Sequence, residues 1–426
     1  MIVIDGIELN GGGKIINYNY RYADDLKKYF TNVPFYVTYD VDVSSVPVSI
    51  LNIPLIANLL PISWFVGFDI EVGELDRVFY HQVEKLKKQF EEYHPLIKNN
   101  ASSLIVKHLT DPAPISSDKK AMLYSGGADA YATLLRHFDE VPDLLSIQGV
   151  DMALGDELQW KGLQTLNDST DIIKPNNKFY IVSSLRKFIS PKVNRLIEGG
   201  DWYGTVQHGL AITALTAPLA YLHQYSTVYI ASSFDRKEGY SFFLWGSLPE
   251  IDNLIKFNNT SISHDGTELT RQEKISYIVD WATRNHEKIH LRVCYSNKTS
   301  ALNCNRCSKC LMTIFAIFNA NQDPNKFGFD VDLNIFGQLK TFLKKGFASP
   351  AKMFFWKEVY QASLTANRFN NDQDGWKKAY REIDLIFPTS FSTPYKEPSW
   401  VEKIKMKWMR KFHQLFSVYK KMRSKL

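Results

Sequence analysis

All four cysteines of the chain lie close together, in the pattern Cys294-x9-Cys304-x2-Cys307-x2-Cys310. Four thiolates at this spacing can complete the tetrahedral coordination of one Zn²⁺, which leaves no position for a catalytic water. The clustering therefore predicts a structural zinc knuckle rather than a disulfide framework. An iron–sulfur cluster uses the same four ligands, and buried cysteines without a metal are a third interpretation.

A glycine-rich segment, Ser125-Gly126-Gly127 followed closely by Asp129, lies between a predicted strand and a predicted helix. Glycines let backbone N–H groups approach an anion, and the helix N-terminus adds a favourable dipole. We expect a phosphate here, with Ser125 donating its hydroxyl and Asp129 holding Mg²⁺ or orienting the loop. The alternative is a simple turn and helix cap.

Further candidates lie at or near predicted strand ends that would face the same cleft. Gln148 and Asp151 follow the second strand, where Gln148 could contact adenine or ribose and Asp151 a substrate. Ser232 ends another strand, Trp245 could stack on a planar substrate, and His208 begins a long apolar helix. The structural alternatives are a turn, a core tryptophan and a structural histidine.

Asp265 and Arg271 stand six positions apart, at a predicted strand end and in the helix that follows. Asp265 is a candidate to bind metal or substrate, and Arg271 could neutralise charge on a departing pyrophosphate. We assign both residues a catalytic role together with Asp129 and His208. A surface Asp–Arg pair beside a capped helix is the alternative.

The elements that must position these residues alternate between apolar strands and amphipathic helices. Strands are predicted at 121–124, 144–150, 178–182, 227–231, 261–263 and 290–293. Helices are predicted at 129–138, 157–166, 205–223, 270–283 and 311–319, with Thr270 and Glu273 at capping-box spacing. This order predicts an α/β fold with an open parallel sheet.

Outside this part the chain divides into further regions. We expect an N-terminal α+β region at 1–115, a central domain at 116–325, a helical extension at 326–398 and a basic amphipathic helix at 399–426. In the first region, a helix is predicted over 75–93. The uncharged run 43–68 has membrane-spanning length, but three prolines interrupt it, which favours a buried strand-turn-helix.

The net charge of +6 is unevenly distributed. Residues 399–426 carry nine basic residues and one acidic residue, a net +8, so the rest has 42 basic and 44 acidic residues, a net −2. A nearly neutral body argues against nucleic acid as a partner. The tail predicts either peripheral contact with an anionic membrane or packing against the body. No secretory signal is evident at the N-terminus, so we expect a cytoplasmic protein.

The string Ser-Gly-Gly-x-Asp at 125–129 resembles the PP-loop of the ATP pyrophosphatase superfamily. Together with the four cysteines, it is similar to 7-cyano-7-deazaguanine synthases of queuosine biosynthesis and their divergent synthase-like relatives, over about 118–320. The chain departs from the family at Ala130, where Ser or Thr is usual, and a Pro-x-Arg-Asn loop is not evident between 181 and 190.

The resemblance implies a fold of the adenine-nucleotide alpha-hydrolase type, with ATP, Mg²⁺ and Zn²⁺ as cofactors. It implies an ATP-dependent ligase that adenylates a small carboxylate or deazapurine-like substrate, releases pyrophosphate and forms a C–N bond. Ala130 motivates a second hypothesis, a catalytically weakened nucleotide-binding scaffold in a multiprotein defence or surface-polysaccharide system. A third is an RNA-modifying PP-loop enzyme. Oligomeric state and protein partners are not determined by these residues.

Overall fold

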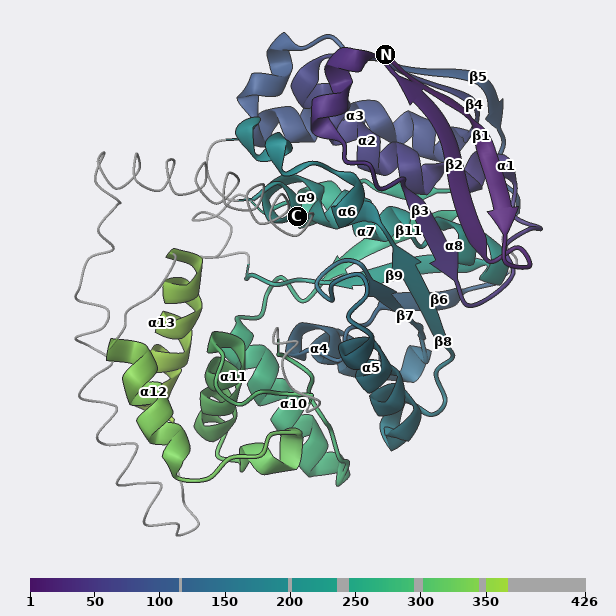
Figure 1. Cartoon of the computed structure of the whole chain (residues 1–426). Helices are drawn as coiled ribbons and strands as arrows, with labels where there is room; N and C mark the ends of the chain where they lie inside the picture. The colour runs from purple at the N-terminus through teal and green to yellow at the C-terminus, as the bar shows by residue number, and fades with distance from the viewer. Residues whose placement is uncertain (115–116, 198–200, 236–244, 295–301, 345–349, 367–426) are drawn as a thin grey trace, which may run out of the picture.

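The computed structural model describes residues 1–114, 117–197, 201–235, 245–294, 302–344 and 350–366. One eleven-stranded sheet runs through these residues in the order β10-β11-β9-β6-β7-β8-β3-β2-β1-β4-β5 (Figure 1). The strands are β1 (Ile2–Asn10), β2 (Ile15–Tyr22), β3 (Tyr36–Tyr39), β4 (Ile70–Asp76), β5 (Leu104–Thr110), β6 (Lys119–Leu123), β7 (Asp143–Gln148), β8 (Lys178–Ser183), β9 (Tyr225–Ala231), β10 (Lys256–Phe257) and β11 (Thr260–Asp265).

Five neighbouring strands of this sheet, β11-β9-β6-β7-β8, are mutually parallel, which confirms the predicted α/β fold. Strand β6 lies in the middle, and the chain moves from it first to β7 and β8 and then back to β9 and β11. The strand order therefore reverses between β6 and β9. Ligands of open α/β sheets bind at such a reversal, beyond the carboxyl ends of the strands.

The predicted strand at 290–293 is wrong, because this segment does not join the sheet. The amide of Leu291 donates to Phe327 O at 3.0 Å, and the amide of Arg292 donates to Gly126 O at 2.7 Å. These bonds to two separate loops replace the ladder that a strand would need.

The N-terminal strands extend the same sheet instead of forming one of their own. Strand β3 pairs antiparallel with β8, with Val37 opposite Ser183. One hydrophobic cluster accordingly contains side chains from both parts, including Ile16 and Leu145.

The uncharged segment 43–68 is buried, as predicted, but it contains no strand. It forms α1 (Val48–Leu51) and α2 (Ile53–Val66), each of which has a proline next to its first turn, where the lost N–H costs little. Within the described residues, no helix combines the length and the apolar character needed to cross a bilayer. Helix α3 (Arg77–Tyr93) follows β4 and ends at His94, as predicted.

The central helices confirm most of the predicted pattern. They are α4 (Ala128–Arg136), α5 (Glu157–Ser169), α6 (Leu185–Phe188), α7 (His208–Ala214), α8 (Ala217–His223), α9 (Pro249–Asp252), α10 (Arg271–Asn285) and α11 (Ser308–Asn319). The capping box of Thr270 and Glu273 is present at the start of α10. The single helix predicted over 205–223 is instead a π-turn (Tyr203–Gln207) followed by α7 and α8, with Pro218 in the first turn of α8.

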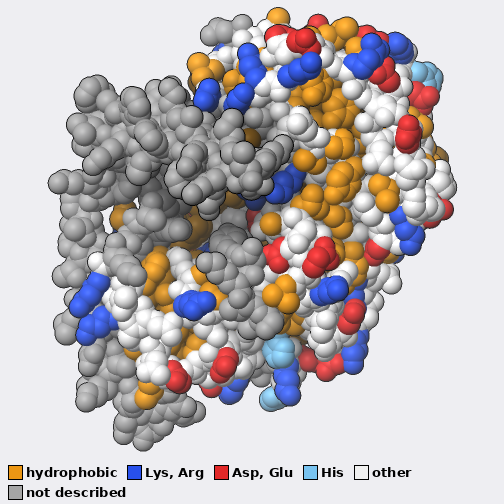
Figure 2. Space-filling view, in the orientation of Figure 1, with side chains coloured by type: hydrophobic (Ala, Val, Ile, Leu, Met, Phe, Trp, Pro, Cys, Tyr) orange, Lys and Arg blue, Asp and Glu red, His pale blue; other side chains and the backbone are white. Residues whose placement is uncertain are grey.

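After the central part, α12 (Asn334–Lys344) and α13 (Pro350–Thr365) pack on α11, and α13 also packs on α10 (Figure 1). The described part of the extension is thus helical, as predicted. Residues 367–426, with the predicted amphipathic tail, lie outside the described residues. Figure 2 shows basic and acidic side chains interspersed over the described surface in this view, without one dominant sign of charge.

Candidate anion and metal sites

The glycine loop connects the carboxyl end of β6 to the N-terminus of α4, where the strand order reverses. Gly126 has a φ of +71°, a left-handed conformation that costs a residue with a side chain roughly 1–2 kcal/mol. Gly127 is the N-cap of α4, and its amide donates to Ser125 Oγ at 3.3 Å. The loop is therefore a sharp turn that places an exposed serine at a helix N-terminus.

Asp129, in the first turn of α4, lies against two cations from the start of α10. Arg271 Nη2 donates to Asp129 Oδ2 at 2.9 Å, and Lys274 Nζ lies 3.8 Å from Asp129 Oδ1. The side chain of Lys274 is only 2% exposed and donates to the carbonyl of Ser232 at 2.5 Å. Burial lowers the pKa of Lys274, while attraction to Asp129 opposes that shift. The sequence indicated Arg271, whereas Lys274 was missed although it lies one helical turn away.

Arg292 is a third cation beside the loop, and sequence analysis did not single it out. Its amide donates to Gly126 O at 2.7 Å, and its Nη2 donates to Gln159 Oε1 at 3.2 Å. Its Nη1 lies 3.5 Å from the carbonyl of Ser125. Burial lowers the pKa of Arg292. Guanidinium groups nevertheless stay protonated in proteins. The only sequence signal was its place two residues before the first metal-ligand candidate, Cys294.

Three cations therefore converge near the glycine loop, and Asp129 is the carboxylate paired with two of them. Fixed positive charge in a partly buried setting, next to a helix N-terminus, favours an anion with several charges. A polyphosphate has this charge.

Asp265 has a different environment from the one that the sequence suggested. Its carboxylate accepts from Thr133 Oγ1 at 2.9 Å and from Arg136 Nε at 3.2 Å, and His137 Nε2 lies 3.3 Å away. Burial raises the pKa of Asp265, but the hydrogen bond from His137 and the charge of Arg136 outweigh it, so the net pKa is lowered. Asp265 thus pairs with the end of α4 and not with Arg271.

Ser232 is fully buried at the end of β9, and its Oγ donates to the carbonyl of Phe234 at 2.6 Å. This hydrogen bond closes a turn, which is the structural alternative to a substrate-binding role for Ser232. The backbone carbonyl of Ser232 accepts a hydrogen bond from Lys274 and so contacts the cation cluster.

His208 and Trp245 form a second group, whose ring centroids are 5.0 Å apart. Tyr203 also packs against His208, and the centroids of these two rings are 5.1 Å apart. Burial lowers the pKa of His208, which keeps its imidazole neutral near pH 7. Trp245 also lies 5.9 Å from Phe234.

The two candidates after the second strand lie at the end of β7. Gln148 is 2% exposed, and its Nε2 has no hydrogen-bond partner among the described residues. Asp151 is exposed in the loop that follows. Of the predicted site residues, the structure brings together Ser125, Gly126, Gly127, Asp129 and Arg271, whereas Asp265 belongs to a separate ion-pair cluster.

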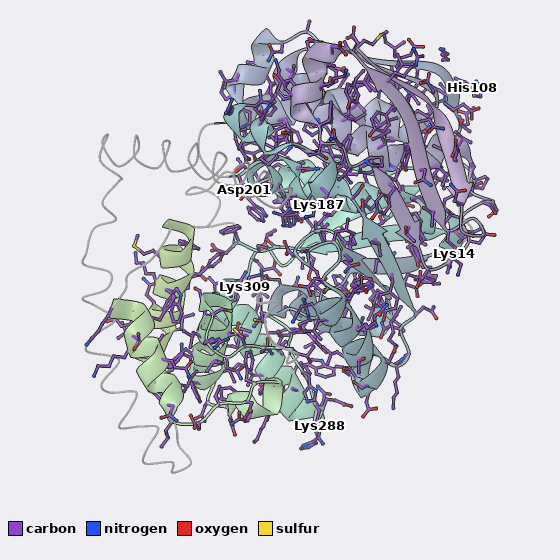
Figure 3. The ribbon with its side chains drawn as sticks, viewed as in Figure 1. Lys14, His108, Lys187, Asp201, Lys288 and Lys309 are labelled. Atoms are coloured by element: carbon purple, nitrogen blue, oxygen red, sulfur yellow. The ribbon has the colours of Figure 1, made fainter. Side chains whose placement is uncertain are left out.

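The four cysteines converge at the start of α11, where Figure 3 shows sulfur atoms beside Lys309. All four Sγ atoms lie within 4.8 Å of one another. The pairs Cys294–Cys307 and Cys304–Cys310 are 3.9 Å apart, and Cys307–Cys310 are 3.5 Å apart. Sulfurs on a tetrahedral ion with Zn–S bonds of about 2.3 Å are separated by about 3.8 Å, whereas a disulfide needs about 2.05 Å.

Backbone amides support this sulfur cluster. The amides of Cys304, Cys307 and Cys310 donate to the sulfurs of the preceding cysteines at 3.3–3.5 Å. Such bonds stabilise thiolates and fix their direction. The four cysteines can therefore hold a metal ion, and the donor set fits Zn²⁺ in a closed structural site.

Fold and site together define an α/β protein with a mostly parallel sheet, a glycine loop at the sheet's reversal point and a four-cysteine cluster that can bind a metal. Comparison with protein-family models, with curated proteins and with solved structures gave no match to this chain.

Proposed function

We propose that this protein binds ATP on the glycine loop and uses it to adenylate a substrate carboxylate, in the manner of the PP-loop ATP pyrophosphatases that its loop motif resembles. The observation that carries the proposal is the convergence of three cations at the carboxyl end of the central strand: Arg271 and Lys274 contact Asp129, and Arg292 contacts Gly126. The PP-loop type of fold, with ATP and Mg²⁺ as its ligands, is part of this proposal.

In the proposed reaction, a substrate carboxylate oxygen attacks the α-phosphorus of ATP. A new O–P bond forms, the bond from the α-phosphorus to the bridging oxygen breaks, and pyrophosphate leaves with that electron pair. Arg271 and Lys274 stabilise the charge on pyrophosphate. Ammonia or an amine then attacks the acyl carbon, forms the C–N bond and displaces AMP.

The pairing of Asp129 with two cations limits its role in this scheme. Its carboxylate already balances Arg271 and Lys274, so Mg²⁺ would be carried mainly by the phosphates of ATP.

Zn²⁺ in the cysteine cluster would stabilise the fold, because four thiolates leave no open coordination position. His208 and Trp245 are the groups proposed to contact a planar, deazapurine-like substrate.

The test is the release of pyrophosphate by the purified, metal-loaded protein with ATP, Mg²⁺, ammonia and candidate deazapurine carboxylates, with mass spectrometry of the products. Substrate-dependent pyrophosphate and a product lacking the carboxylate oxygen support the ligase. The same reaction with Gly127→Val is the matched control, because that variant alters only the loop. No pyrophosphate with any carboxylate would contradict catalysis.

The second candidate, a nucleotide-binding scaffold, is favoured by the prior engagement of Asp129 and by Ala130, which is 5% exposed in the core. A hydroxyl at position 130 would therefore lie on the buried face of α4 and not on the loop surface. A scaffold is expected to bind ATP without releasing pyrophosphate. Retention of transfer RNA by the protein would instead support the RNA-modifying alternative.

A further inference from the structure

Helix α13, from the region after the central sheet, reaches the cation cluster with two side chains. The centroid of the Phe355 ring lies 4.6 Å from the guanidinium carbon of Arg271. The same ring stacks on Phe234, which follows β9, with centroids 5.0 Å apart. Arg271 is thus held by Asp129 of α4 and by Phe355 of α13.

The position of α13 is fixed by contacts of two residues that follow Phe355. The Trp356 side chain is fully buried, and its Nε1 donates to Ser308 Oγ at 3.2 Å. Asn319 Nδ2 donates to the carbonyl of Val359 at 2.8 Å. Because these bonds reach both ends of α11, they fix the position of α13 and with it the backbone of Phe355.

Glu358 lies one turn after Phe355 and adds a titratable group to the same cluster. The charged groups that face it are Arg271 and Lys274 of α10 and Asp235 of the segment after β9. Burial raises the pKa of Glu358 to about 7, and Asp235 adds to the shift while Arg271 and Lys274 oppose it. Its Oε2 is buried without a hydrogen-bond partner among the described residues.

We propose that α13 is a wall of the anion site that regulates its affinity: Phe355 positions Arg271, and the carboxylate of Glu358 competes with a bound polyphosphate for the charge of Arg271 and Lys274. This inference rests on the proposed function and adds a form of regulation to the same site. When Glu358 is ionised, it cancels part of the positive charge of Arg271 and Lys274 that Asp129 leaves unbalanced; when it is protonated, that part acts on the ligand.

The experiment measures tripolyphosphate binding by calorimetry with full-length, metal-loaded protein at about pH 6 and about pH 8, on either side of the Glu358 transition. Phe355→Ala is expected to weaken binding about fivefold at both pH values, because the stacked ring orients the guanidinium of Arg271. Phe355→Trp keeps a stacked ring and is expected to bind like the wild-type protein. Glu358→Gln is expected to strengthen binding about fivefold near pH 8 and to have little effect near pH 6. Each variant is compared with the wild-type protein at the same pH, so the change in the protonation of tripolyphosphate between the two pH values affects both proteins equally.

Val359→Ala is the matched control, since it removes buried packing from α13 but leaves Phe355 and Glu358 in place. An equal loss of affinity in Val359→Ala and Phe355→Ala would overturn the positioning role of Phe355. Glu358→Gln binding no tighter than wild type near pH 8 would overturn the competition. If the wild-type protein does not bind tripolyphosphate, the proposed function is wrong. If the wild-type protein binds it and the variants bind it equally well, only the role of α13 is wrong.

Discussion

The backbone amide of Arg292 donates to the carbonyl oxygen of Gly126 at 2.7 Å, which joins the segment that leads to Cys294 directly to the glycine loop. Asn303, within the same knuckle, holds this segment from the other side: it accepts from the amide of Val293 at 3.0 Å and donates to the carbonyl of Leu291 at 2.7 Å. The metal cluster and the candidate anion site are therefore neighbours in one structural unit. Loss of the metal should disturb the loop.

We expect Cys307→Ser to reduce bound zinc well below one ion per chain and to lower the Tm by at least about 5 °C, because metal binding is coupled to folding. Elemental analysis and thermal unfolding measure the two effects. Arg306→Ala, in the same knuckle but without a ligand atom in the cluster, should keep one zinc. Iron in place of zinc, or a wild-type zinc content in the serine variant, would contradict the assignment.

Gly127→Val should weaken ATP binding strongly while leaving the fold intact. Gly127 has a φ of −80°, which other residues adopt readily, and an added Cβ would lie 3.2 Å from Ser125 Oγ. The side chain therefore occupies the space that a phosphate needs, and we expect affinity to fall at least about tenfold. Calorimetry measures it. Gly337→Ala, where an added Cβ meets nothing within 4 Å, should bind ATP like wild type.

Asp129→Asn should lower turnover more than ATP affinity, and it should also destabilise the protein. The change leaves Arg271 and Lys274 without their counter-charge, at a cost of about 1–3 kcal/mol in the free energy of unfolding. Denaturant titration and steady-state pyrophosphate release separate the two effects. Asp5→Asn is a useful comparison, since Asp5 forms an exposed pair with Arg21 and its loss should change unfolding little. Equal stability of the two variants would argue against a buried charge cluster.

His137 should make stability depend on pH. Its Nδ1 lies 2.8 Å from Glu140 and its Nε2 lies 3.3 Å from Asp265. Burial lowers the pKa of His137, but the hydrogen bonds with Asp265 and Glu140 outweigh it and raise the net pKa above 6.5. The stabilisation is thus complete below about pH 6.5 and is lost as pH rises through the higher folded value.

His137→Gln is expected to remove this part of the pH dependence, as measured by denaturant unfolding between about pH 6 and about pH 8. His81→Gln, an exposed histidine on α3, should retain the wild-type profile. A profile in His137→Gln that matches wild type would show that the histidine does not carry a proton between the two carboxylates.

The sequence by itself determined the features whose signals are local. The glycines at 126 and 127, the cysteine spacing and the Thr270–Glu273 capping box each encode a turn, a ligand set or a helix start within a few residues. The five parallel strands were also predicted, because runs of apolar residues at strand spacing indicate burial in a sheet.

Only the tertiary structure decided which distant side chains meet. Lys274 and Arg292 join the glycine loop because α10 and the segment before Cys294 pack beside α4, and Phe355 arrives from α13. Asp265 pairs with Arg136 and His137, and not with Arg271, for the same reason. Such contacts join residues far apart in the chain and depend on packing direction, which no local pattern of residue types encodes.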